Sequence, residues 1–209
     1  GNGEVWAENT NHRISMGEAV HACKSRGGVP VGSATFGTDT TGLDAIDGAG
    51  KPWQAYVFGT QVAEVEVDTI TGEVQVLGVW AAHDVGRAVN PMMIEGQIVG
   101  GFAQGLGGAL YEEFQYAETG APLSVTFADY LLPTSCDVAR VDVLLTEDAP
   151  SPLNPLGLKG AGEAGVTAVG ATIASAIDGA IGAPFAVISL PVSPHALVDL
   201  VKRRGLRRP

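Results

Sequence analysis

One carboxylate stands out as a candidate for proton-transfer chemistry because small residues surround it on both sides. Glu163 lies in the run Lys159-Gly160-Ala161-Gly162-Glu163-Ala164-Gly165. Val166, Val169, Ile173 and Ile177 follow at helical spacing, which predicts a helix with Glu163 in its first turn. The positive end of a helix dipole favours an ionised carboxylate, and glycines let a ligand approach closely. The pattern predicts a general base, although a helix-capping glutamate would give the same pattern.

A second glycine-rich segment follows Asn90-Pro91, a pair typical of a helix start. Each glycine costs a helix interior roughly 1 kcal/mol relative to alanine, so another backbone or a ligand must approach this helix closely. Gln97 and Gln104 are seven residues apart and share one helical face, where amides could grip a large polar ligand. The glycines of this segment are Gly96, Gly100, Gly101, Gly105, Gly107 and Gly108.

The run Gly160-Ala161-Gly162-Glu163-Ala164-Gly165 also has the spacing GxGxxG of a dinucleotide-binding loop. That function needs a buried strand directly before the loop and an acidic residue at the end of a second strand. Residues 154–159 instead have loop composition, and the next acid, Asp178, falls inside a predicted helix. The context of the run therefore argues against a dinucleotide-binding loop. A nucleotide-binding or non-catalytic α+β domain, with this segment as a phosphate loop, is kept as the alternative interpretation.

The sequence offers no side-chain set with metal-ligand spacing. Cys23 and Cys136 are far apart, and the four histidines form no HExxH pair. This usage predicts reduced thiols, a cytoplasmic location and no metal held by protein side chains. The chain starts at Gly1 without methionine and without a signal peptide, which favours a piece of something longer.

Composition restricts the class of protein further. Of the 209 residues 45% are apolar, which supports a sizeable core, and the net charge of -11 argues against a nucleic-acid binder. The apolar run 164–191 is rich in small residues and is interrupted by Asp178 and Pro184. It is therefore interpreted as a buried helix and not as a membrane span.

The elements that must position these residues alternate irregularly, which predicts the α+β class. Residues 1–53 are expected to form one region and residues 54–209 the main domain. Strands are predicted at residues 4–8, 54–67, 73–80 and 140–146, and the turn 68–72 joins the middle pair as a hairpin. Helices are predicted at residues 15–26, 90–110, from about 165 onward, and 194–203, with a glycine-rich loop over 27–50.

Five motifs occur in an order that resembles the molybdopterin-binding large subunit of the xanthine oxidase family, in its C-terminal part. The motifs are His83-Asp84-Val85-Gly86-Arg87-Ala88-Val89-Asn90-Pro91, Glu95-Gly96-Gln97-Ile98-Val99-Gly100-Gly101, Gln104-Gly105-Leu106-Gly107, Asp129-Tyr130-Leu131-Leu132-Pro133-Thr134 and the run around Glu163. The resemblance is strong over residues 54–185. It implies a mixed sheet with packed glycine-rich helices.

The resemblance also implies roles for single residues. Glu163 corresponds to the active-site base beside molybdenum, and Gln97 to a residue that contacts the cofactor. Gly160 and Gly162 would lie against the cofactor, and Lys159 fits the same pattern, although it could simply anchor the loop. His83 and Asp84 are interpreted as structural, because neighbouring residues of a strand point to opposite faces.

The resemblance implies a molybdenum hydroxylase that acts on an N-heterocycle, an aldehyde or a similar small molecule with oxygen from water. Molybdenum–molybdopterin is the expected cofactor, in the cytosine dinucleotide form, with 2Fe-2S clusters and FAD on partner subunits or domains. The expected partners are the N-terminal half of the large subunit and the iron–sulfur and flavin subunits, with a homo-oligomer as a further option. The ending Glu163-Ala164-Gly165 differs from the GEPP form common in purine oxidases, which disfavours a xanthine substrate. The isolated chain is expected to be inactive.

Overall fold

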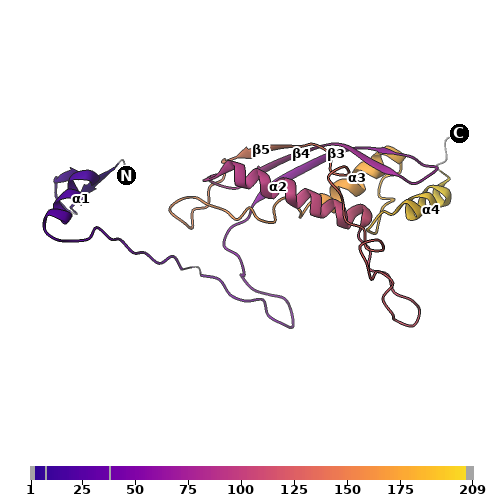
Figure 1. Ribbon diagram of the computed structural model, residues 1–209, viewed down its shortest axis with the longest axis horizontal. Coiled ribbons are helices and arrows are strands. Elements are labelled where there is room, and N and C mark those ends of the chain that lie inside the picture. Colours follow the sequence, from indigo (N-terminus) through magenta and orange to yellow (C-terminus); the bar gives the residue numbers. More distant parts are fainter. Residues whose placement is uncertain (1–2, 8, 38, 206–209) are drawn as a thin grey trace. The chain divides into compact units, whose positions relative to one another are not determined.

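The computed structural model describes residues 3–7, 9–37 and 39–205. The chain divides into two compact units, residues 1–42 and residues 43–209. This division falls inside the glycine-rich loop, earlier in the chain than the region boundary expected at residue 53. Each unit is therefore described by itself (Figure 1).

The first unit is a small hairpin followed by one helix. Strand β1 (Glu4–Trp6) pairs antiparallel with β2 (Arg13–Ser15), which the sequence patterns did not predict. Helix α1 (Met16–Ser25) begins with a capping box, in which the Ser15 side chain and the Glu18 side chain each accept the other residue's backbone N–H. None of the described residues 3–42 is fully buried, so this unit has no core of its own. Residue 8, at the end of the predicted first strand, lies outside the described residues.

The second unit is built on a mixed three-stranded sheet. Strand β3 (Phe58–Val67) runs antiparallel to β4 (Val74–Asp84), and β5 (Val141–Thr146) runs parallel to β4 on its other side. The sheet confirms the predicted α+β class. Two predicted bounds were wrong. Of the two hairpin strands, β3 begins at Phe58 and not at residue 54, because Phe58 pairs with Asp84, the last residue of β4. The second extends to Asp84 and not to residue 80, because β5 pairs with it to that end.

The helices cover one face of this sheet (Figure 1). Helix α2 (Pro91–Leu106) continues as a π-helical turn η1 (Gly107–Tyr111), and the other two helices are α3 (Val169–Ile181) and α4 (Pro194–Arg204). The buried core between helices and sheet consists of Val76, Val79, Phe102, Leu106, Ala109, Leu110, Val169, Ile173, Ile177, Val192, Leu197 and Val201. On the opposite face of the sheet Val62, Leu77, Trp80 and Leu144 are exposed.

Two helix boundaries differ from the prediction. The helix after Asn90 keeps α geometry only to Leu106 and closes with wider turns, in which Glu112 N–H donates to Gly107 O. The third helix begins at Val169, so Glu163 does not lie in its first turn as predicted. The Gly165 carbonyl accepts from the Gln61 side chain, and Val169 N–H donates to Val166 O, which is three residues away instead of four. Residues 162–168 are therefore turns, and an α-helix starts only after them.

The apolar run 164–191 contains α3, whose Val169, Ile173 and Ile177 are fully buried in the core, as predicted. Among the described residues, no helix combines the length and the apolar character that crossing a membrane requires.

Candidate active site

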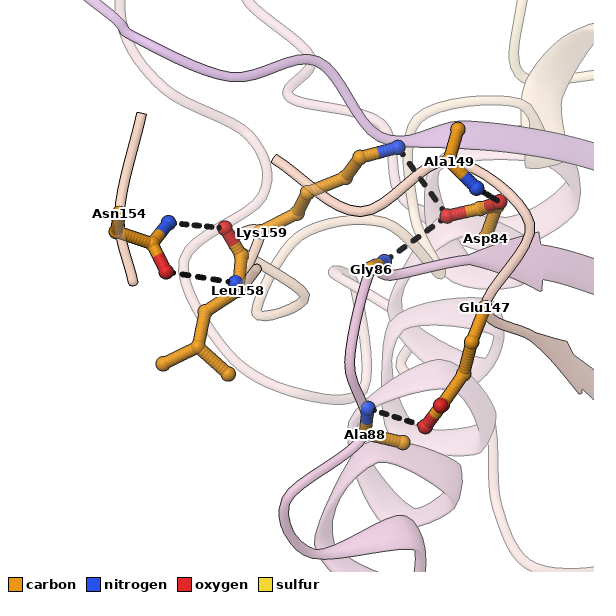
Figure 2. Close-up of polar contacts among 8 residues, drawn as sticks. All are labelled: Asp84, Gly86, Ala88, Glu147, Ala149, Asn154, Leu158 and Lys159. Atoms are coloured by element: carbon orange, nitrogen blue, oxygen red, sulfur yellow. Dashed lines mark hydrogen bonds and ion pairs between the residues drawn. The ribbon is translucent and has the colours of Figure 1, made fainter. Parts of the chain in front are cut away.

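The segment that leads to Glu163 is anchored to the end of β4 by one carboxylate (Figure 2). Asp84 accepts hydrogen bonds from the backbone N–H of Gly86 at 2.9 Å, from the N–H of Ala149 at 2.7 Å and from Lys159 Nζ at 3.1 Å. The Lys159 side chain is only 4% exposed and that of Asp84 only 9%. This buried ion pair fixes the loop 149–159 at both of its ends.

The surroundings of the pair stabilise its charges. The Gly86 N–H, and then Ala149 N–H and Lys159, lower the pKa of Asp84 against an opposing effect of burial. Lys159 Nζ also lies 4.5 Å from the centroid of the Phe58 ring, a cation–π distance. The lysine ammonium is thus enclosed within the protein, as expected for an anchor of the loop.

Backbone pairing continues this anchoring along residues 85–87. Lys159 N–H donates to Val85 O at 3.1 Å, and Arg87 N–H donates to Gly157 O at 3.0 Å. Gly86 and Gly157 both have positive φ, and the Gly157 carbonyl occupies the place where a Gly86 Cβ would lie. The motif beginning at His83 therefore serves as the scaffold of the glycine-rich loop.

The loop is shaped further by bonds within and beside it. The Asn154 side chain accepts from Leu158 N–H and donates to Leu158 O, both at 2.9 Å (Figure 2). The Glu147 carboxylate accepts from Ala88 N–H at 2.6 Å, just before helix α2 begins. The chain on both sides of the loop is thereby held to the start of α2.

Downstream of Glu163 the chain packs directly against α2. Gln61 Nε2 donates to Gly165 O at 2.8 Å, and the missing Cβ of Gly165 would overlap the Ile98 backbone. A Cβ at Gly101 would lie 2.9 Å from Gly165 C, and one at Gly105 would meet the Val169 side chain. At these positions the close approach predicted for the glycines is made by the chain at residues 165–169, through backbone at Gly101 and through a side chain at Gly105.

Gly96 and Gly100 of α2, and Gly108 of the following turn η1, have open space beside them. Added Cβ atoms at Gly96, Gly100 and Gly108 would meet nothing within 4 Å. Gln97 and Gln104 are exposed on the same helix. One side of α2 is therefore a smooth packing surface, and another presents bare backbone flanked by amides.

The predicted residues of the loop also face outward. Gly160, Gly162 and Glu163 are exposed, and the two glycines have open space where a Cβ would be. The expected helix N-terminus at Glu163 was wrong, because α3 starts at Val169, and the helix-dipole argument for its ionisation falls with it. The Glu163 carbonyl accepts instead from Val166 N–H at 3.2 Å and from Thr167 Oγ1 at 3.0 Å.

Sequence reasoning missed the contribution of two side chains that hold this loop, Gln61 and Asp84. A pairing of Asp84 with Lys159 could have been suspected from opposite charges in two motifs of one site, whereas nothing in the sequence signals the role of Gln61. His83, on the other side of β4, is 3% exposed, and its ring lies against Gly59. Neither of its ring nitrogens has a partner among the described residues, and burial lowers its pKa.

The described residues contain no group of three or more histidine, cysteine, aspartate or glutamate side chains placed to hold a metal ion. Residues 1–139 match the family model of the molybdopterin cofactor-binding domain. This is two thirds of the chain. The chain belongs to the molybdopterin-binding subunits of the xanthine oxidase family.

Relatives of this molybdopterin-binding chain cover several oxidoreductases. It is similar to the 6-hydroxypseudooxynicotine dehydrogenase complex subunit gamma of Paenarthrobacter nicotinovorans, with 46% sequence identity. The matched region covers 68% of this chain and 18% of that subunit. Among solved structures it is similar to the aldehyde oxidoreductase of Desulfovibrio gigas, with a TM-score of 0.68, 34% identity and coverage of 78% of this chain and 17% of that one. CO dehydrogenase from Oligotropha carboxidovorans gives a TM-score of 0.69 and 29% identity, with coverage of 76% and 20%. The chain thus spans about a fifth of the length of these relatives.

Proposed function

We propose that this chain supplies the general base and part of the cofactor cradle of a molybdenum hydroxylase. The observation that carries the proposal is the joining of two exposed glycine-lined surfaces, because the loop with Glu163 packs on the helix that presents Gln97. The proposed reaction is hydroxylation of an N-heterocycle, an aldehyde or a similar small molecule with oxygen from water.

The residues present fit a large, flat cofactor. Gly96, Gly100, Gly160 and Gly162 leave backbone bare, where any side chain would stand between the protein and a bound group. Gln97 offers both an amide donor and an acceptor beside that surface. Bound molybdenum–molybdopterin would supply the two-electron oxidation, with the metal held by the cofactor's own sulfur atoms.

Each side chain has a distinct proposed task. Gln97 would hydrogen-bond the cofactor, and the backbone at Gly160 and Gly162 would lie against it. Glu163 would accept the proton of the water-derived oxygen as that oxygen attacks an electron-poor carbon of the substrate. Lys159 would contribute indirectly, since its ammonium is committed to Asp84 and only its backbone continues into the cradle.

The relatives act on chemically different small molecules, and carbon monoxide dehydrogenases are among them. The gamma subunit that is 46% identical belongs to a dehydrogenase complex whose name gives a hydroxylated pseudooxynicotine as substrate. We therefore place N-heterocycle derivatives ahead of aldehydes for this chain. We also propose the cytosine dinucleotide form of the pterin and a cytoplasmic location. The proposed partners are the remainder of the large subunit and the iron–sulfur and flavin subunits, which would carry the 2Fe-2S clusters and FAD.

The alternative function, a phosphate loop in a nucleotide-binding domain, has less support. The residue before Lys159 forms only an isolated bridge with Gly86, and no strand of the sheet leads into Gly160. An α-helix does not follow the loop directly either, so the two elements that a dinucleotide loop requires are both missing from the described segment 150–168.

Glu163→Gln in the complete enzyme tests the proposed function. The substitution keeps the size of the side chain and removes its basicity, so we expect kcat to fall about 100-fold or more. Molybdenum and pterin content should stay at the wild-type level. Glu66→Gln, at an exposed position of β3, is the matched control and should keep full activity. A Glu163→Gln enzyme with more than half of the wild-type kcat would refute the assignment of the base.

A further inference from the structure

We propose that Gln61 and Asp84 are positioning residues that fix the loop 159–165 at its two ends and so determine where Glu163 stands. The inference rests on the proposed function, since it concerns the placement of the same carboxylate. Both side chains belong to the sheet, which is the most regular part of this unit, and neither belongs to the loop that they hold.

The upstream end of the loop is held through Lys159, four residues before Glu163. Asp84 binds Lys159 Nζ at 3.1 Å while its carboxylate also accepts the N–H groups of Gly86 and Ala149. One carboxylate thus joins the end of β4 to Ala149 and to Lys159, which are ten residues apart in the sequence. Because both side chains of the pair are less than 10% exposed, water competes little for these bonds.

The downstream end is held through Gly165, two residues after Glu163. Gln61, on β3, donates to the Gly165 carbonyl at 2.8 Å, a bond between residues 104 positions apart in the sequence. Gly165 is buried and lies on the Ile98 backbone of α2, so this point of the loop cannot shift without moving the helix.

Between these two fixed points the loop has little else to define the carboxylate. Residues 162–168 form turns without a helix start at Glu163, and Gly160 and Gly162 have no neighbours that restrict them on the side where a Cβ would be. The Glu163 side chain is exposed. A general base must stand within hydrogen-bond reach of its proton, so the backbone path between the two anchors controls its placement.

The first test uses Gln61→Met in the complete enzyme, with Gln75→Met as the control. Methionine keeps the length of the side chain and removes the donor, and Gln75 is an exposed glutamine of β4, in the same sheet. We expect kcat to fall about tenfold or more with a smaller change in KM, because misplacement by about 1 Å is costly. Amide hydrogen exchange across residues 159–166 should become faster, while the amides of β3 and β4 stay protected.

The second test removes the other anchor. Asp84→Asn alone leaves a buried lysine unpaired and can prevent folding, so it is combined with Lys159→Met to give a neutral pair. The matched control is Asp142→Asn on β5, which removes the charge from an exposed ion pair with Arg140. The double variant should show the same faster exchange in the loop and the same loss in kcat, with its thermal unfolding still cooperative.

The outcomes separate this inference from the proposed function. If Glu163→Gln abolishes turnover while both anchor variants keep wild-type kcat, the positioning role is wrong and the base assignment stands, whatever the exchange rates show. If the anchor variants keep the wild-type rates of amide hydrogen exchange in the loop and the wild-type kcat, the loop does not depend on these side chains. If Glu163→Gln is fully active, the proposed function fails, and faster loop exchange in the anchor variants would then establish them as structural anchors only.

Discussion

His83 and Asp84 are neighbours on β4, but the alternation of a strand gives them opposite surroundings. Asp84 reaches backbone donors and a lysine that favour its charged form, whereas His83 lies buried with no partner for either ring nitrogen among the described residues. Burial without a partner disfavours the charged imidazolium, which is why its pKa is lowered. The two residues therefore respond to acid in different ranges of pH.

Stability should fall as the pH is lowered past the ordinary pKa of histidine, about 6.5. The unfolded chain then binds a proton that folded His83 refuses, so the contribution of His83 to stability is complete above pH 6.5 and is lost below it. Through this one group the free energy of unfolding cannot change by more than about 1.4 kcal/mol per pH unit. Urea unfolding at about pH 7.5 and pH 5.5 measures the difference, which His83→Gln should reduce.

The control is His21→Gln, because His21 is an exposed histidine of α1, outside the unit that contains His83. It should leave the pH dependence of unfolding as in wild type. Asp84 does not confuse this window: its lowered pKa contributes stability that is present above about pH 4 and lost only as the pH falls further. Equal slopes for wild type and His83→Gln would contradict the assignment to His83.

At the scale of elements, the glycines of α2 divide the helix into a packed side and an open side. Gly101 and Gly105 let the chain at Gly165 and Val169 come into contact, as smooth helix faces do in close-packed interiors. Gly96 and Gly100 make no such contact. Adjacent glycines of one helix thus have different reasons to be glycine, and substitution can tell them apart.

We expect Gly101→Ala to destabilise the protein and Gly100→Ala to stabilise it. An added Cβ at Gly101 would lie 2.9 Å from backbone atoms of residues 165 and 166, which must shift, whereas at Gly100 the space is open. Alanine at the open position gains up to about 1 kcal/mol of helix propensity. Chemical denaturation of both variants against wild type measures these opposite signs. Two stabilised variants would show that the contact at Gly101 yields easily.

The elements themselves were largely predictable, because local signals determine them. Asn90 caps α2 through Met93 N–H, and Ser15 and Ser193 cap their helices, as the sequence indicates. The start of α3 was not predictable, because residues 162–168 form turns beside contacts with distant residues, such as the bond from Gln61 to the Gly165 carbonyl 104 positions away. The motif around Glu163 could therefore be found, and opposite charges hint at the pairing of Asp84 with Lys159, but the Gln61 anchor and the turn geometry could not be predicted.

At the scale of the whole molecule, the second unit has one covered face and one bare face of its sheet. Helices bury one side, while Val62, Trp80 and Leu144 on the other are 46–60% exposed. These large apolar residues on the outer face of the sheet were not foreseen from the sequence. Large exposed apolar side chains that lie together on one face of a sheet favour association.

We therefore expect the purified 209-residue protein to self-associate as its concentration rises. Val62→Thr combined with Leu144→Thr should lower the association constant, because both changes remove apolar area from the bare face and suit a strand. Ile70→Thr is the control, since Ile70 is 78% exposed in the β3–β4 turn, away from this face. Sedimentation velocity over a range of concentrations measures the effect. Unchanged association of the double variant would place the contact elsewhere.

The openness of the candidate site leads to a last prediction, that the 209-residue protein alone binds no stoichiometric molybdenum and is inactive. Gln97, Gly160, Gly162 and Glu163 all lie on an exposed surface, so a bound cofactor would keep its other side in water. Binding sites for cofactors enclose most of the ligand, and the described residues supply neither a second wall nor a set of metal-ligating side chains. Metal analysis and dye reduction with an aldehyde or an N-heterocycle test this directly. Near-stoichiometric molybdenum with turnover would show that these two glycine-lined surfaces suffice to hold the cofactor.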